Sequence, residues 1–143
     1  MSVCTFFGHH DCPPEIKPKL REVLTELIEK RNVDMFYVGN SGAFDRLVRS
    51  VLRELTQKYS HISYAVVLSR LPEGRDGEDF SDTILPEGIE EAPPRFAISW
   101  RNKWMLSKTE LVVTYVTRSW GGAWQFSEKA KSRGKIVIEL GNK

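Results

Sequence analysis

Three short glycine-bearing turns hold most of the residues in this sequence that could bind a charged ligand. They are Gly8-His9-His10-Asp11, Gly39-Asn40-Ser41-Gly42 and Ser119-Trp120-Gly121-Gly122. Each turn follows a run of apolar residues and precedes an amphipathic segment, as expected where a strand leads into a helix. Glycine lets a backbone approach a ligand closely, and a helix N-terminus attracts phosphates and carboxylates. One such turn is often a plain connection, but three in one chain favour an anion-binding site.

Hydrophobic periodicity predicts the elements that position these turns. Strands are expected at about residues 3–7, 33–38, 62–68, 111–116 and 135–140. Helices are expected at about residues 14–31, 43–59, 96–106 and 123–133. This alternation predicts an α/β fold, a Rossmann-like three-layer sandwich with about five mostly parallel strands flanked by helices. Ligands bind at the carboxyl ends of such strands, so the three turns should meet at that edge of the sheet.

Length and composition indicate a single domain over residues 1–143, with the apolar fraction of 41% and charged fraction of 28% of a globular protein. The net charge is only +2 and the basic residues are scattered, which argues against a nucleic acid or a membrane as partner. No apolar run reaches the roughly 20 residues of a membrane span, and no signal peptide is recognisable. With two cysteines, we expect a reducing, cytoplasmic location.

The stretch from about residue 69 to residue 94 interrupts the strand–helix pattern. It is rich in Pro, Gly, Asp and Glu and has few candidates for the core. A loop of this length within a compact domain is usually functional or mobile. Two interpretations stay open: a solvated crossover between elements, or a lid over the binding site.

The histidines and cysteines do not predict a metal centre. The spacing of Cys4, His9, His10 and Cys12 does not match the common zinc sites. Cys4 lies inside a predicted strand and is expected in the core, whereas His9 and His61 are expected at the surface. We therefore predict neither a metal nor a cofactor.

The glycine turns and their neighbours resemble those of the SLOG superfamily, which joins the LOG phosphoribohydrolases to the DprA proteins. LOG enzymes carry Pro-Gly-Gly-x-Gly-Thr-x-x-Glu after the fourth strand, and here residues 120–128 keep the two leading glycines and Glu128. The stretch Arg101-Asn102-Lys103-Trp104-Met105 is similar to the LOG pattern Arg-Lys-x-x-Met. Gly39, Gly42 and Asp45 follow the spacing of DprA and of small stand-alone SLOG proteins, which this chain resembles most, over nearly its whole length.

The resemblance implies that the chain binds a nucleotide or a nucleotide-derived signalling molecule, as a sensor or a sequestering protein in antiviral defence or counter-defence. It also implies a homo-oligomer, because SLOG proteins commonly self-associate. If the chain were an enzyme, Arg101 and Glu128 would be the catalytic pair, lying together at the edge of a pocket. Trp124 and Gln125 stand where LOG enzymes have small phosphate-contacting residues, and this departure favours a binder over a hydrolase.

The residues expected to contact the ligand come from the three turns, from the helices that follow them and from the 96–106 helix. They are Gly8, His10, Asp11, Gly39, Asn40, Ser41, Gly42, Asp45, Arg101, Ser119, Trp120, Gly121, Gly122, Trp124, Gln125 and Glu128. Simpler roles stay open for several of them. Asp11 could cap the next helix, Asp45 could complement a helix dipole, and Glu128 could favour the first turn of its helix. Trp120 and Trp124 could stack on a nucleobase.

Three functions are therefore compared. The first is non-catalytic binding of a nucleotide-derived molecule. The alternative is a LOG-like phosphoribohydrolase that cleaves the N-glycosidic bond of a nucleoside monophosphate. The third is DprA-like binding of single-stranded DNA, against which the charge of +2 and the acidic stretch at 73–91 argue.

Overall fold

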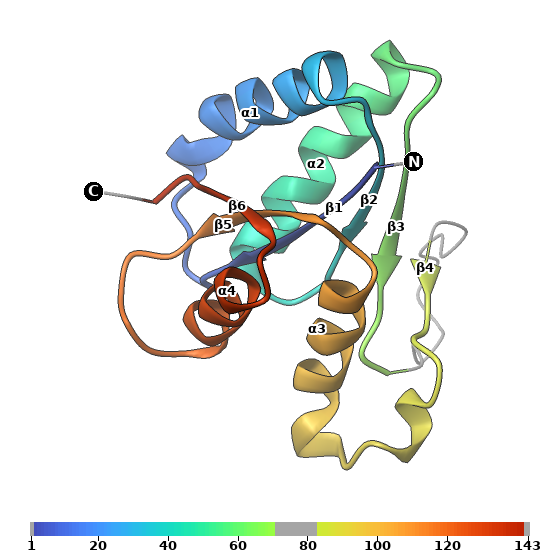
Figure 1. The fold of residues 1–143 in the computed structure, drawn as a ribbon, viewed down its shortest axis with the longest axis vertical. Coiled ribbons are helices and arrows are strands. Elements are labelled where there is room, and N and C mark those ends of the chain that lie inside the picture. Colours follow the sequence, from blue (N-terminus) through green and yellow to red (C-terminus); the bar gives the residue numbers. More distant parts are fainter. Residues whose placement is uncertain (1, 71–82, 142–143) are drawn as a thin grey trace.

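The computed structural model of this chain describes residues 2–70 and 83–141, and within them six parallel strands form one sheet in the order β4-β3-β2-β1-β5-β6 (Figure 1). The strands are β1 (Ser2–Gly8), β2 (Val33–Val38), β3 (Ser63–Val67), β4 (Thr83–Ile84), β5 (Leu111–Tyr115) and β6 (Ile136–Glu139). The predicted α/β class and Rossmann-like arrangement are confirmed.

In the described part of the chain, four helices cover the two faces of this sheet and complete a three-layer sandwich (Figure 1). They are α1 (Lys17–Lys30), α2 (Gly42–Lys58), α3 (Ala97–Ser107) and α4 (Gly122–Ser132), with 3-10 turns η1 (Pro14–Ile16), η2 (Ile89–Glu91) and η3 (Pro94–Phe96). Helices α1 and α2 lie on one face, and α3 and α4 lie on the other. Successive strand residues point to opposite faces, so Phe6 packs in the core under α1 and α2 while Phe7 packs under α3 and α4.

Two expectations need correction. The helix predicted from residue 14 starts with the 3-10 turn η1, because Pro14 and Pro18 withhold backbone donors from its first turns. The region predicted as one loop contains the sixth strand, β4, which pairs with β3 through Val66 and Thr83, followed by η2. A strand of only two residues is too short to show an alternation of apolar and polar residues in the sequence. The rest of that region, residues 71–82, lies outside the described residues.

The winding of the sheet reverses between β1 and β5. From β1 the chain moves outward through β2 and β3 to β4, and it returns through α3 to place β5 on the other side of β1 (Figure 1). The connections leave the carboxyl ends of β1 and β5 in opposite directions, which opens a crevice between them. Among residues 2–70 and 83–141, no helix is long and apolar enough to cross a membrane.

Candidate functional site

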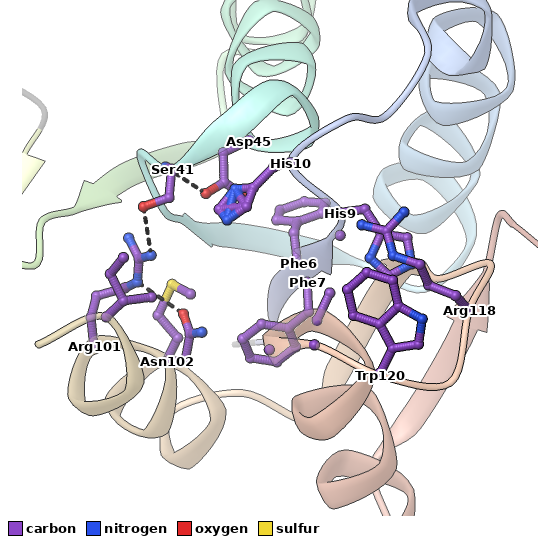
Figure 2. A pocket seen from close by; sticks show the side chains of 16 residues that line it. Phe6, Phe7, His9, His10, Ser41, Asp45, Arg101, Asn102, Arg118 and Trp120 are labelled. Atoms are coloured by element: carbon purple, nitrogen blue, oxygen red, sulfur yellow. Dashed lines mark hydrogen bonds between the residues drawn. The ribbon is translucent and has the colours of Figure 1, made fainter. Parts of the chain in front are cut away.

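A cavity of about 250 Å³ opens beyond the carboxyl ends of β1 and β5, where the winding reverses (Figure 2). Its walls come from the end of β1, the turns after β1, β2 and β5, and the inner side of α3. The lining residues are Phe6, Phe7, Gly8, His9, His10, Ser41, Asp45, Ile98, Arg101, Asn102, Met105, Arg118, Trp120, Gly121, Gly122 and Ala123. Residues from all three glycine turns therefore lie together at one edge of the sheet, as the sequence predicts.

The N-terminus of α4 forms one end of this cavity. Gly121 precedes the helix at φ 95° and ψ 171°, a conformation that is essentially restricted to glycine. No side chain caps the helix, and the N–H groups of Gly122, Ala123 and Trp124 have no acceptor among the described residues. Unpaired donors and the helix dipole favour an anion at this place.

Arg118 and Trp120 stand beside that helix end (Figure 2). The Arg118 guanidinium lies 4.5 Å from the centre of the Trp120 ring, and its Nη1 lies 3.2 Å from Asp11 Oδ2. Its Nε is buried without a hydrogen-bond acceptor in the described part of the chain. The sequence reasoning overlooked Arg118, although a cation that follows a buried strand at the binding edge was the signal that could have identified it.

Arg101, which belongs to α3, lies at the opposite end of the cavity from the α4 N-terminus. Only 2% of this residue is exposed. Its Nε donates to Asn102 Oδ1 at 2.9 Å, and its Nη1 donates to the Val67 carbonyl at 2.9 Å and to Asn40 Oδ1 at 3.2 Å. Its Nη2 donates to Ser41 Oγ at 3.2 Å. Burial lowers the pKa of Arg101, while the nearby Asp45 opposes that shift. These bonds fix the guanidinium at the ends of β2 and β3.

Asp45, in the first turn of α2, is buried close to Arg101. Its Oδ2 accepts the Ser41 backbone N–H at 2.9 Å. Burial raises the pKa of the Asp45 carboxyl, and the positive charge of Arg101 partly offsets this. A Cβ atom on Gly39 would lie 2.4 Å from Arg101 Nη1 and 2.7 Å from Asp45 Oδ2, so this turn requires glycine for the two charged groups to approach.

The two histidines of the turn after β1 have different surroundings. His10 lines the cavity, and its carbonyl accepts the Ala43 N–H at 2.9 Å, which ties this turn to the start of α2. His9 was expected at the surface, and that expectation is wrong, because the side chain is 4% exposed. His9 Nε2 accepts the Thr117 N–H at 3.0 Å, so the ring is neutral in this contact. Burial lowers the pKa of His9, and Arg118 lowers it further.

Half of the predicted ligand-contacting residues line the cavity: Gly8, His10, Ser41, Asp45, Arg101, Trp120, Gly121 and Gly122. Three more support it from behind. Gly39 and Asn40 contact Arg101, and Gly42, at φ 94°, packs against His10, where a Cβ would lie 2.7 Å from Nδ1.

The remaining five predicted residues do not line this cavity. Asp11 is paired with Arg118, and Gln125 donates its backbone N–H to the Gly121 carbonyl. Ser119, Trp124 and Glu128 line a separate cavity of about 210 Å³ between α4 and the end of β6.

Arg101 and Glu128 therefore do not form the expected pair at one pocket edge. Glu128 lies about 1.7 turns along α4 from Gly122, where it pairs with Lys131 at 3.4 Å, and Lys131 also pairs with Glu139 at 2.8 Å. The N-terminus of α4 lines the same cavity as Arg101, whereas the Glu128 side chain lines the other one. The separation removes the geometric basis for a joint role of these two residues.

Comparison of the chain with known protein families and with curated proteins gives no match.

Proposed function

We propose that this chain binds a nucleotide or a nucleotide-derived signalling molecule without turning it over, as a sensor or sequestering protein. The observation that carries the proposal is the position of an uncapped helix N-terminus and Arg118 at the point where the sheet winding reverses. Parallel α/β sheets bind their ligands at this point, and these groups suit a phosphate there. The SLOG-like motifs of the sequence support the same class of ligand.

Charge on the cavity wall supports an anionic ligand. Arg101 and Arg118 are the two arginines among the described lining residues, against one carboxyl group, that of Asp45. The α4 dipole adds a partial positive charge of roughly +0.5. Desolvation inside the cavity strengthens the attraction for a phosphate compared with an exposed site.

Trp120 provides a surface for a nucleobase. Its side chain is 64% exposed and lines the cavity beside the helix end, while Arg118 covers one side of the ring. Stacking of a base on an exposed aromatic ring is worth about 1–3 kcal/mol. A phosphate at the α4 N-terminus and a base on Trp120 would account for both ends of a nucleotide.

A ligand screen tests the proposal. The protein is incubated with nucleoside monophosphates, cyclic mono- and dinucleotides and ADP-ribose derivatives, followed by thermal shift and mass spectrometry of the released ligand. A ligand at 100 times its Kd stabilises the native state by about 2.7 kcal/mol, so a binder raises the melting temperature and is recovered intact. If no member of the panel raises it, the proposal fails.

Paired arginine variants localise the effect. We expect Arg118→Gln to reduce ligand affinity about tenfold or more, since a charge-assisted hydrogen bond contributes about 1.5–3 kcal/mol. Arg133→Gln removes an equal charge at the far end of α4 and should leave affinity within twofold. Equal losses in the two variants would indicate a diffuse charge effect and no defined phosphate site.

A phosphoribohydrolase is the second candidate, and one observation favours it. Asp45 lines the cavity with a raised pKa, which suits a general acid. The Glu128 of the LOG-like motif, in contrast, lines the other cavity. Free base and ribose phosphate in the mass spectra, lost on Asp45→Asn but retained on Glu128→Gln, would make the chain an enzyme and overturn the first proposal.

A further inference from the structure

The two ends of the cavity differ in their electrostatic character. Figure 2 shows Arg118 and Trp120 at one end, Arg101 with Asn102 and Ser41 at the other, and the rings of Phe6 and Phe7 between them. At the α4 end, Asp11, the carboxylate that faces Arg118, is outside the cavity lining and its side chain is 70% exposed. At the Arg101 end, the carboxyl group of Asp45 is itself part of the buried wall.

Asp45 makes the Arg101 end a poor place for a second phosphate. A Cβ atom on Gly39 would lie 2.4 Å from Arg101 Nη1 and 2.7 Å from Asp45 Oδ2, so the guanidinium and the carboxyl group lie close to each other. A phosphate placed against Arg101 would meet this buried carboxyl group, and like charges repel strongly where water is excluded. Arg49, the other arginine near Asp45, donates to the Gly39 carbonyl at 3.3 Å and does not line the cavity.

The Arg101 end retains one donor and one acceptor for a neutral group. Arg101 uses four of its five N–H groups, which leaves one on Nη2 without an acceptor among the described residues. Asp45 Oδ2 is occupied by Ser41, and Oδ1 has no donor in that same part of the chain. A hydroxyl group both donates and accepts, so a pair of neighbouring hydroxyls matches this arrangement.

The size of the cavity limits what fits between the two ends. Its volume of about 250 Å³ is below the roughly 300–1,000 Å³ of pockets for drug-sized ligands. A sugar phosphate is of suitable size, with the base left outside on Trp120. Phe6 and Phe7, at the end of β1, line the cavity between its two ends and make this part of the wall apolar.

From these observations, and resting on the proposed function, we infer that Arg101 and Asp45 form a subsite for the vicinal diol of a ribose whose single phosphate binds at the α4 N-terminus. Asp45 accepts a hydrogen bond from one hydroxyl and Arg101 donates to the other. The subsite selects ribonucleotide-type ligands with one phosphate in the cavity, and it rejects deoxyribose analogues and ligands that would place a second phosphate beside Asp45.

Titration calorimetry on the full chain tests the inference with three probes: inorganic phosphate, methyl riboside 5-phosphate and its 2-deoxy analogue. We expect all three to bind, with the riboside about tenfold tighter than the deoxy compound, the effect of one hydrogen bond to a charged group. Asp45→Asn should remove this difference without weakening the binding of inorganic phosphate. Asp34→Asn, which removes a carboxylate outside the cavity, should change neither.

The other outcomes separate the inference from the proposed function. Equal affinity for the two sugars in the unsubstituted protein would overturn the diol subsite while the phosphate site stands, and this comparison needs no folded variant. An equal loss of all three probes on Asp45→Asn would show that Asp45 acts only on the structure of the cavity. If none of the three probes binds, the diol subsite is overturned together with the phosphate site at the α4 N-terminus, whereas the proposed function fails only if the nucleotide panel also gives no binder.

Discussion

At the scale of single residues, the cavity depends on Gly39 because the Arg101 guanidinium and the Asp45 carboxyl group occupy the space that a side chain would need. We predict that Gly39→Ala lowers the free energy of unfolding by about 1–3 kcal/mol, as other overpacked core sites do. Urea unfolding measures this change in the free energy of unfolding. Gly122→Ala is the matched control, since no atom of the described residues lies within 4 Å of its Cβ position. Equal losses at both positions would contradict the crowding argument.

His9 gives the fold a dependence on pH. Its ring accepts the Thr117 N–H in the neutral form, and burial lowers its pKa in the folded state below the ordinary value of 6.5. The unfolded chain then binds more protons near that value, so stability rises with pH. His9 contributes its full stability above pH 6.5, and this contribution is lost as the pH falls through 6.5 toward the lower folded pKa.

The variant His9→Gln isolates this contribution. A glutamine amide oxygen can replace Nε2 as acceptor but does not titrate. We expect urea unfolding of the unsubstituted protein to lose stability between pH 7 and pH 5, and the variant to lose less. Titration of Asp45 acts in the opposite direction, because its raised pKa costs stability as pH rises, and it is common to both proteins. Parallel pH profiles would show that His9 does not titrate in this range.

At the scale of elements, helix α4 has a glycine with positive φ at each end, but only its N-terminus lines the cavity. Gly121 has φ 95° before the helix and Gly134 has φ 75° after it. We predict that Gly121→Ala and Gly134→Ala each cost about 1–3 kcal/mol of stability. Only Gly121→Ala should also weaken sulfate binding, because it displaces the N–H groups at the cavity. Sulfate titration followed by Trp fluorescence checks this, and equal weakening would argue against the helix end.

The same helix explains what the sequence could predict about the site and what it could not. The motif Gly121-Gly122 before an amphipathic segment predicts a helix start at the carboxyl edge of the sheet, and α4 begins there, beside the cavity. Whether Glu128 faces Arg101 depends on how α4 rotates against β6, where Lys131 and Glu139 hold it. This packing is tertiary, and no local pattern in the sequence encodes it. The burial of His9 against Thr117 is a contact of the same kind.

At the scale of the whole molecule, strand position should determine local stability. Strand β1 is paired on both sides and buried under helices on both faces, whereas β4 is a two-residue edge strand. We predict that hydrogen exchange is slowest in β1 and β5 and much faster in β4, because edge elements open without unfolding the core. Exchange measured by mass spectrometry tests this, and protection of β4 equal to that of β1 would contradict it.

The central place of β1 also affects how the chain folds during synthesis. Its two neighbours, β2 and β5, begin at residues 33 and 111, so one partner is made early and the other about eighty residues later. A nascent chain can assemble β1 to β3 with α1 and α2, but Phe7 and one edge of β1 stay uncovered until β5 and α4 emerge. The cavity is therefore completed last, because Arg118 and residues 120–123 form part of its wall, and a ribosome-bound chain stalled before residue 111 would expose an unpaired strand edge that chaperones recognise.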